Sequence, residues 1–158
     1  KYGSWRLCQN LNYSTSSLYI MNKTEFDKVI SEYSFSKIGD IRLINNELKF
    51  NNIVNYKTHG HVYLWVEKKE NDYVIVYVGK AGKTINARCQ QHSTGFKKST
   101  TGKKHAARLI KGFNSGYSYE LYARKSKSES ICDEHQIPME CVEEIAFIKK
   151  FSPAWNAI

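Results

Sequence analysis

The fold is decided by residues 61–92, which read HVYLWVEKKENDYVIVYVGKAGKTINARCQQH. Side chains alternate along 61–69 with a period of two, which is the pattern of a half-buried strand. Residues 74–79, VIVYVG, are almost all β-branched or aromatic and predict a second strand. Because residues 70–72 between them form a short polar turn, the sequence predicts an antiparallel β-hairpin.

A helix is predicted directly after this hairpin. We expect Gly79 to let the backbone leave the sheet in a conformation that a Cβ would resist, and Thr84 to N-cap the helix. Arg88 and His92 are four residues apart and therefore share one face of that helix.

The hairpin and helix together resemble the core of the GIY-YIG endonuclease superfamily. Residues 61–63, HVY, stand where the first triplet of the motif is expected, and residues 77–79, YVG, stand where the second is expected. Arg88 and His92 match the arginine of that family and the histidine one turn later.

The likeness continues toward the C-terminus. Glu144 with residues 147–156, FIKKFSPAWN, resembles the family's glutamate helix and its Pro-x-aromatic-Asn tail. Through residues 32–35 and 120–124 the chain is most similar to the T-even phage endonuclease II type and the small GIY-YIG Type II restriction enzymes. The likeness covers roughly residues 32–156 and, as a series of ordered blocks, is more specific than any single triplet.

Three departures from the family pattern affect the site. His61 replaces the usual glycine of the first triplet. Arg88 comes one residue later than the family spacing leads us to expect, which indicates an insertion within 79–84. Glu143 and Glu144 are adjacent, so both are candidates for the metal ligand, and the spacing to the tail favours Glu144.

The resemblance implies an α+β fold with a small, three-stranded antiparallel sheet flanked by helices. We expect residues 59–158 to form the nuclease core and residues 1–58 to be an N-terminal extension packed on it. The other expected elements are a capping-box helix at 23–33, a small hairpin at 41–50, a basic loop at 96–102, a helix at 103–114, a strand at 117–123 and a charged loop at 126–133. A last helix is expected to begin at Pro138. We expect its residues Cys141, Ile145 and Ile148 to face the core.

Phosphodiester hydrolysis needs a base for the attacking water, a cation near the phosphate and stabilisation of the departing oxygen. A tyrosine with a free pKa near ~10 needs a neighbour such as His92 to act as that base. The planar guanidinium of Arg88 suits phosphate oxygens, and one carboxylate, Glu144, can hold Mg²⁺, with Mn²⁺ as a substitute. The catalytic set that the resemblance implies is Tyr63, Tyr77, Arg88, His92, Glu144 and Asn156.

Each of these residues also has a simpler interpretation. The tyrosines can be ordinary strand aromatics, Arg88 and His92 a solvated helix face, Glu144 a surface residue and Asn156 a cap. Their joint order favours a Mg²⁺-dependent endonuclease for double-stranded DNA. The alternative is a basic module that binds DNA or RNA without cutting it.

The chain is strongly basic, with 24 Lys and Arg against 15 Asp and Glu in 158 residues and a net charge of +9. A solvated surface explains part of this excess, but a polyanionic partner is favoured. The candidate nucleic-acid contacts are Lys80, Lys97, Lys98, Lys103, Lys104, His105 and Lys111.

Four cysteines include two Cys-x-x-His pairs, Cys89 with His92 and Cys132 with His135, so a zinc site and free thiols are the two alternatives. Free thiols are favoured, since structural zinc sites more often use other spacings. No stretch approaches the ~20 apolar residues of a membrane span, so we expect a cytoplasmic protein of a bacterial or phage-infected cell.

A homodimer or higher oligomer on DNA is expected, because one active site cuts one strand and a symmetric pair cuts both. The aromatic residues that we expect to supply the contact are Trp5, Tyr13, Tyr19 and Phe26.

Overall fold

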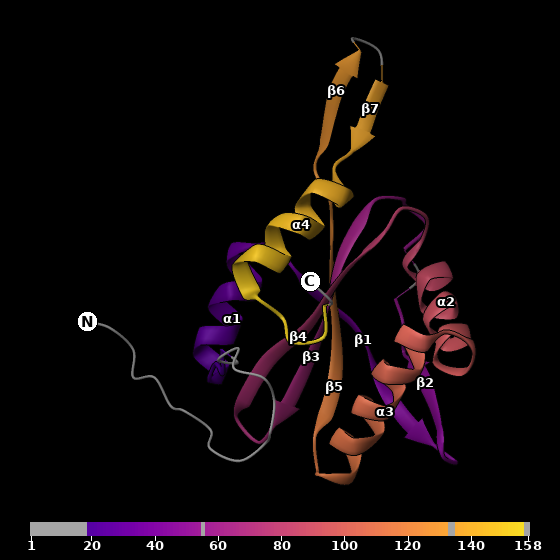
Figure 1. The fold of residues 1–158 in the computed structure, drawn as a ribbon. Helices are drawn as coiled ribbons and strands as arrows, with labels where there is room; N and C mark the ends of the chain where they lie inside the picture. The colour runs from indigo at the N-terminus through magenta and orange to yellow at the C-terminus, as the bar shows by residue number, and fades with distance from the viewer. Residues whose placement is uncertain (1–18, 55, 133–134, 157–158) are drawn as a thin grey trace.

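The computed structural model describes residues 19–54, 56–132 and 135–156, without the side chains of residues 131 and 132. This part of the chain forms a five-stranded sheet, a separate two-stranded hairpin and four helices (Figure 1). The elements in chain order are α1 Lys23–Glu32, β1 Ser36–Ile44, β2 Glu47–Asn51, β3 His61–Lys69, β4 Asp72–Ala81, α2 Ile85–Lys98, α3 Thr100–Asn114, β5 Ser118–Lys125, β6 Ser128–Cys132, β7 His135–Pro138 and α4 Glu140–Phe151.

The large sheet is antiparallel with the strand order β2-β1-β5-β3-β4. The predicted hairpin is confirmed, since β3 pairs with β4 from Lys69 opposite Asp72 onward. The prediction of three strands is wrong: β1 pairs with β5, with Ile41 opposite Tyr119, so the hairpin β1-β2 extends the same sheet. Elements before and after residue 58 therefore share one sheet.

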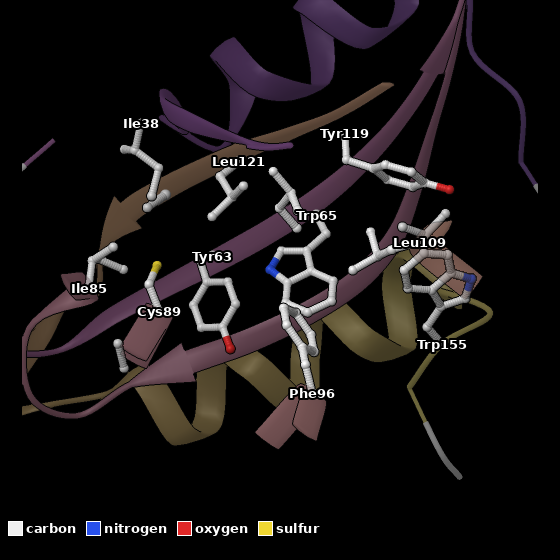
Figure 2. Close-up of a cluster of buried hydrophobic side chains, with 14 of the residues drawn as sticks. Ile38, Tyr63, Trp65, Ile85, Cys89, Phe96, Leu109, Tyr119, Leu121 and Trp155 are labelled. Atoms are coloured by element: carbon white, nitrogen blue, oxygen red, sulfur yellow. The ribbon is translucent and has the colours of Figure 1, made fainter. Parts of the chain in front are cut away.

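Helices cover both faces of this sheet, with α2 and α3 on one side and α1 and α4 on the other (Figure 1). On β3, Tyr63 and Trp65 belong to the cluster under α2 and α3, which Figure 2 shows, while Val62 and Leu64 belong to the cluster under α1 and α4. All four side chains are at most 3% exposed. The prediction of a half-buried strand was therefore wrong, because the alternation separates two cores rather than core from solvent.

A β-bulge interrupts the pairing of β3 with β4. Trp65 lies opposite Tyr77 but Val66 lies opposite Ile75, so Val76 is an extra residue on β4. As a result Val76 and Tyr77, although consecutive, both pack on the α2/α3 cluster. Bulges often re-aim a side chain next to an active site, and this one turns Tyr77 toward Tyr63, with 6.1 Å between the ring centroids.

The starts of α1 and α2 follow the predicted caps. Asn22 and Glu25 form the capping box of α1, and the Thr84 side chain accepts a hydrogen bond from the backbone of α2. The loop predicted at 96–102 is wrong, because Ser99 both ends α2 and caps α3. Within the described residues, no helix is both long and apolar enough to cross a membrane.

The C-terminal third also differs from expectation. The predicted charged loop contains β6, which pairs with β7 in a hairpin that projects from the end of the molecule (Figure 1). Pro138 ends β7, so α4 begins at Glu140 instead.

The core-facing side of α4 was predicted wrongly at two positions. Cys141 is exposed and Ile145 is 55% exposed, whereas Ile148 packs against the α1/α4 cluster. The buried residue of α4 is Phe147, whose ring makes edge contacts with Tyr33 and Phe35. Packing of this large ring sets the rotation of the helix.

The aromatic set expected to form a dimer contact divides into different environments. Phe26 is fully buried and stacks on Tyr73, so it cannot supply a surface, while Tyr19 is 50% exposed. Trp5 and Tyr13 lie outside the described residues.

Candidate functional site

The Tyr63 hydroxyl group is the centre of a polar cluster under α2. Nε2 of His92 lies 2.5 Å from this hydroxyl oxygen, and Nε of Arg88 donates a hydrogen bond to it at 3.2 Å. The Thr84 cap fixes where α2 begins, and the two residues one turn apart then point at the same oxygen. The prediction that Arg88 and His92 share a face is confirmed.

Gly79 has a spatial role in this cluster. A Cβ at Gly79 would lie 2.4 Å from the Tyr63 hydroxyl oxygen, so the tyrosine occupies the space that any other residue would need. The backbone of Gly79 does not take a left-handed φ, and β4 continues to Ala81. The prediction that Gly79 lets the chain leave the sheet is therefore wrong, and the glycine instead leaves space for the Tyr63 hydroxyl group.

Burial sets the protonation states of the cluster. Burial, followed by the neighbouring Tyr77, raises the pKa of Tyr63 well above its ordinary value, and Arg88 offsets only part of that rise. Burial, followed by the charge of Arg88, lowers the pKa of His92 to about 3. At neutral pH a neutral phenol is therefore hydrogen-bonded to a neutral imidazole.

Gln91, which orients Arg88, was not among the predicted site residues. Nη1 of Arg88 donates to Oε1 of Gln91 at 2.9 Å, which holds the guanidinium plane while Nε contacts Tyr63. The signal was available, because Gln91 lies three residues after Arg88 on the same helix.

The Tyr77 ring packs among other rings beside this cluster. Its centroid lies 4.8 Å from Trp65, 5.9 Å from His92 and 5.2 Å from His105. His105 is only 4% exposed, and its Nε2 lies 3.2 Å from the Trp155 carbonyl oxygen. Because α3 begins at Thr100, His105 lies within the helix rather than at its start, away from the exposed lysines with which it was grouped.

A second polar group lies between β4 and α4. Nζ of Lys80 lies 3.6 Å from the Glu144 carboxylate and donates to Sγ of Cys141 at 3.2 Å. Glu143 faces elsewhere: its Oε1 accepts hydrogen bonds from Nη2 of Arg124 at 3.3 Å and from the backbone N–H of Lys127 at 2.9 Å. Glu144 is therefore the carboxylate that points toward Lys80.

The two groups lie on opposite faces of one strand. Gly79 faces Tyr63, and the next residue, Lys80, faces α4, since it is paired with Val62 of the other cluster. β4 is an edge strand of the sheet, and Gly79 and Lys80, which mark the two groups, are consecutive on it.

The described residues contain no group of three or more His, Cys, Asp and Glu side chains that could hold a metal ion. A cation at Glu144 would therefore depend on one carboxylate, with water and substrate oxygens completing its shell. Burial raises the pKa of the Cys89 thiol to about 12, which disfavours the thiolate that zinc binds.

Asn156 binds the edge strand. Its Oδ1 accepts from the Val78 backbone N–H at 2.8 Å, and its Nδ2 donates to the Val78 carbonyl at 2.7 Å. The backbone N–H of Trp155 donates to the Val76 carbonyl at 3.0 Å. The tail thus pairs with β4 beside the bulge, and the Asn156 side chain serves the backbone there.

The lysines predicted to contact nucleic acid on α2 and α3 are all exposed. Lys97 forms an ion pair with Glu47 of β2, with 3.1 Å between Nζ and the carboxylate. The exposed set is Lys97, Lys98, Lys103, Lys104 and Lys111.

No family model matches the chain. Endonuclease II of enterobacteria phage T4 is 29% identical over 135 residues, which is 82% of this chain and 94% of the relative. The structure of a mutant of the same phage enzyme matches with a TM-score of 0.66 at 28% identity, over 83% of this chain and 98% of that one. A restriction endonuclease in complex with product DNA matches with a TM-score of 0.51 at 21% identity, over 84% and 82% of the two chains, which shows a likeness of fold alone. These matches confirm the predicted resemblance and the mixed α/β fold.

Proposed function

We propose that this homologue of phage T4 endonuclease II is a Mg²⁺-dependent endonuclease that hydrolyses phosphodiester bonds in double-stranded DNA. The observation that carries the proposal is the Tyr63 hydroxyl group held between Nε2 of His92 and Nε of Arg88. Any buried tyrosine hydroxyl needs a hydrogen-bond partner, but the partners here are an imidazole that can take its proton and a cation that stabilises negative charge on its oxygen.

Tyr63 acts as a proton relay in this mechanism. Its raised pKa disfavours a free phenolate, so it accepts a proton from the attacking water as it passes its own proton to His92. The resulting hydroxide attacks phosphorus, and the bond to the leaving oxygen breaks. A bound phosphate offsets the charge of Arg88, which raises the pKa of His92 and makes the imidazole a better acceptor.

Arg88 supplies the fixed positive charge. Its guanidinium is permanently protonated, and Gln91 holds its plane, so it stabilises negative charge on the phosphate oxygens in the transition state. Tyr77 lies beside both Tyr63 and His92 and closes this side of the site to water.

Glu144 is the residue that would hold Mg²⁺. Its side chain is 19% exposed and faces Lys80, and a single carboxylate with water and phosphate oxygens suits this ion, which Mn²⁺ can replace. When bound, the metal supplies charge stabilisation at the phosphate. We propose that Lys80, which pairs with Glu144 in the free protein, binds a phosphate oxygen when Glu144 holds the metal.

The exposed lysines of α2 and α3 are proposed to contact the DNA backbone. Their number implies a steep salt dependence of binding, because each neutralised phosphate releases counterions. Since one site cuts one strand, we also propose that a double-strand break requires two copies of the chain arranged symmetrically on the duplex. Light scattering with and without a bound duplex tests this arrangement.

Plasmid DNA incubated with the protein and Mg²⁺, with and without EDTA, tests the proposed activity. We expect nicked or linear product with Mg²⁺ alone, none with EDTA, and none from Tyr63→Phe. Tyr122→Phe is the matched control, since Tyr122 lies on the other face of the sheet, hydrogen-bonded to Glu120. Binding without cleavage of any DNA, modified or unmodified, would instead identify a binding module.

A further inference from the structure

A groove of about 630 Å³ runs between β2, with Ile53 after it, and the outer side of α2. Its volume lies in the range of about 300–1,000 Å³ that is usual for ligand sites. It is distinct from the Tyr63 site, which lies on the inner side of the same helix.

The rim of the groove is positively charged. Lys49, Lys97 and Lys98 line it together with one carboxylate, Glu47. The Glu47 carboxylate lies 3.1 Å from Nζ of Lys97 and 4.0 Å from Nζ of Lys49, so both lysines lie beside one carboxylate at the rim. Three lysines against one glutamate leave a net positive charge, which suits a phosphate.

The floor of the groove is aromatic. Phe50 is half-buried there and stacks on Phe96, with ring centroids 5.9 Å apart and planes 11° apart. The Phe50 centroid also lies 6.2 Å from that of His92. The floor therefore contacts the residue that receives the proton in the proposed mechanism.

The wall of the groove carries hydrogen-bonding side chains. Gln90 and Thr94 are four residues apart on α2, exposed, and line the groove with their amide and hydroxyl groups. An aromatic floor, a basic rim and polar wall groups are the features with which proteins bind unpaired nucleotides.

We propose that this groove binds an unpaired nucleotide of the DNA substrate, a proposal that rests on the proposed function. Its base lies against Phe50, its edge meets the polar wall formed by Gln90 and Thr94, and its phosphate meets Lys49, Lys97 and Lys98. The contact between Phe50 and His92 links occupancy of the groove to the catalytic cluster.

Binding is measured in EDTA, so that cleavage is not needed, with fluorescein-labelled oligothymidylate and a labelled duplex as probes. Phe50→Leu keeps an apolar floor but removes the ring, and we expect it to weaken binding of the single strand about tenfold and of the duplex less than about twofold. Phe151→Leu, a half-buried residue on the opposite face of the sheet, is the matched control and should change neither.

Lys98→Glu, with Lys28→Glu on α1 as the control of equal charge, should weaken single-strand binding and lower its salt slope by about 0.7 or more.

Oligothymidylate carrying 4-thiothymidine should crosslink, on irradiation, to peptides that contain residues 47–53 or 86–98. Crosslinks elsewhere, or equal effects of Phe50→Leu and Phe151→Leu, would overturn the proposal. If Lys98→Glu acts but Phe50→Leu does not, the rim contacts only backbone phosphates and the proposal is also wrong. Plasmid cleavage that persists beside any of these results leaves the proposed activity standing.

Discussion

Nε2 of His92 lies 2.5 Å from the hydroxyl oxygen of Tyr63, although the two residues are 29 positions apart in the chain. Both groups are neutral at pH 7, because burial lowers the pKa of His92 to about 3 and raises that of Tyr63. The pair is therefore a hydrogen bond ready for proton transfer, and it makes the folded state sensitive to acid.

The first prediction concerns this acid sensitivity. An unfolded His92 binds a proton near pH 6.5, whereas the folded one does so near pH 3, so between these values the unfolded state binds more protons and stability rises with pH. The contribution of His92 to the free energy of unfolding is fully present above about pH 6.5 and is lost as the pH falls toward 3. This contribution is at most about 5 kcal/mol. His92→Gln should flatten the dependence of the free energy of unfolding on pH in urea titrations from pH 4 to 7.

Thr94→Ala changes an exposed residue of the same helix that has no titratable group, and it should leave that dependence as in the wild type. His61 and His105 also have pKa values lowered by burial, so the His92 variant should keep part of the slope. An unchanged slope in His92→Gln would contradict the neutral imidazole on which the proton relay depends.

The local part of the fold could be predicted from the sequence. The hairpin β3-β4, the Thr84 cap and the shared helix face of Arg88 and His92 depend on neighbours in sequence, so periodicity and capping rules suffice.

Pairing between distant segments could not be predicted in the same way. Nothing near Ile41 indicates that β1 pairs with β5, and that pairing turns an expected three-stranded sheet into a five-stranded one. Likewise, Lys80 meets Glu144 only because α4 packs on the far face of β4. The choice between Glu143 and Glu144 stayed open for the same reason, since Arg124, which binds Glu143, comes from β5.

The second prediction separates the two glutamates. Glu144→Gln should lower the rate of DNA cleavage about 10³-fold or more, because it removes the carboxylate proposed to hold Mg²⁺, while duplex binding in EDTA stays within about twofold. Glu143→Gln should keep activity but lower the free energy of unfolding by about 1–3 kcal/mol, since it weakens the hydrogen bonds from Arg124 and Lys127. Single-turnover cleavage and thermal melting measure the two effects. Activity lost in Glu143→Gln and kept in Glu144→Gln would place the metal ligand one residue earlier.

The third prediction concerns the space above Gly79. Gly79→Ala places a Cβ 2.4 Å from the Tyr63 hydroxyl oxygen, so the ring must move away from His92. We expect a loss of about 1–3 kcal/mol of stability and a loss of cleavage that lower temperature does not restore. Gly95→Ala is the control, because its Cβ meets only Ser99 Oγ at 3.4 Å and the helix gains about 0.5–1 kcal/mol. If Gly79→Ala cleaves DNA at the wild-type rate, the position of the Tyr63 hydroxyl is not critical and the relay is wrong.

The last prediction concerns Asn156, whose side chain pairs with both backbone groups of Val78 on the edge strand. In Asn156→Asp the carboxylate still accepts from the Val78 N–H but faces the Val78 carbonyl with no proton to donate, which should cost about 1–3 kcal/mol. The tail also binds Val76 within the bulge that turns Tyr77 toward the site, so loosening the tail should lower the cleavage rate without changing duplex affinity.

Hydrogen exchange should report faster exchange along β4, and Asn114→Asp, an exposed change at the end of α3, should leave that exchange unchanged. If Asn156→Asp abolishes cleavage while the exchange of β4 stays that of the wild type, Asn156 acts on the substrate itself rather than through the strand.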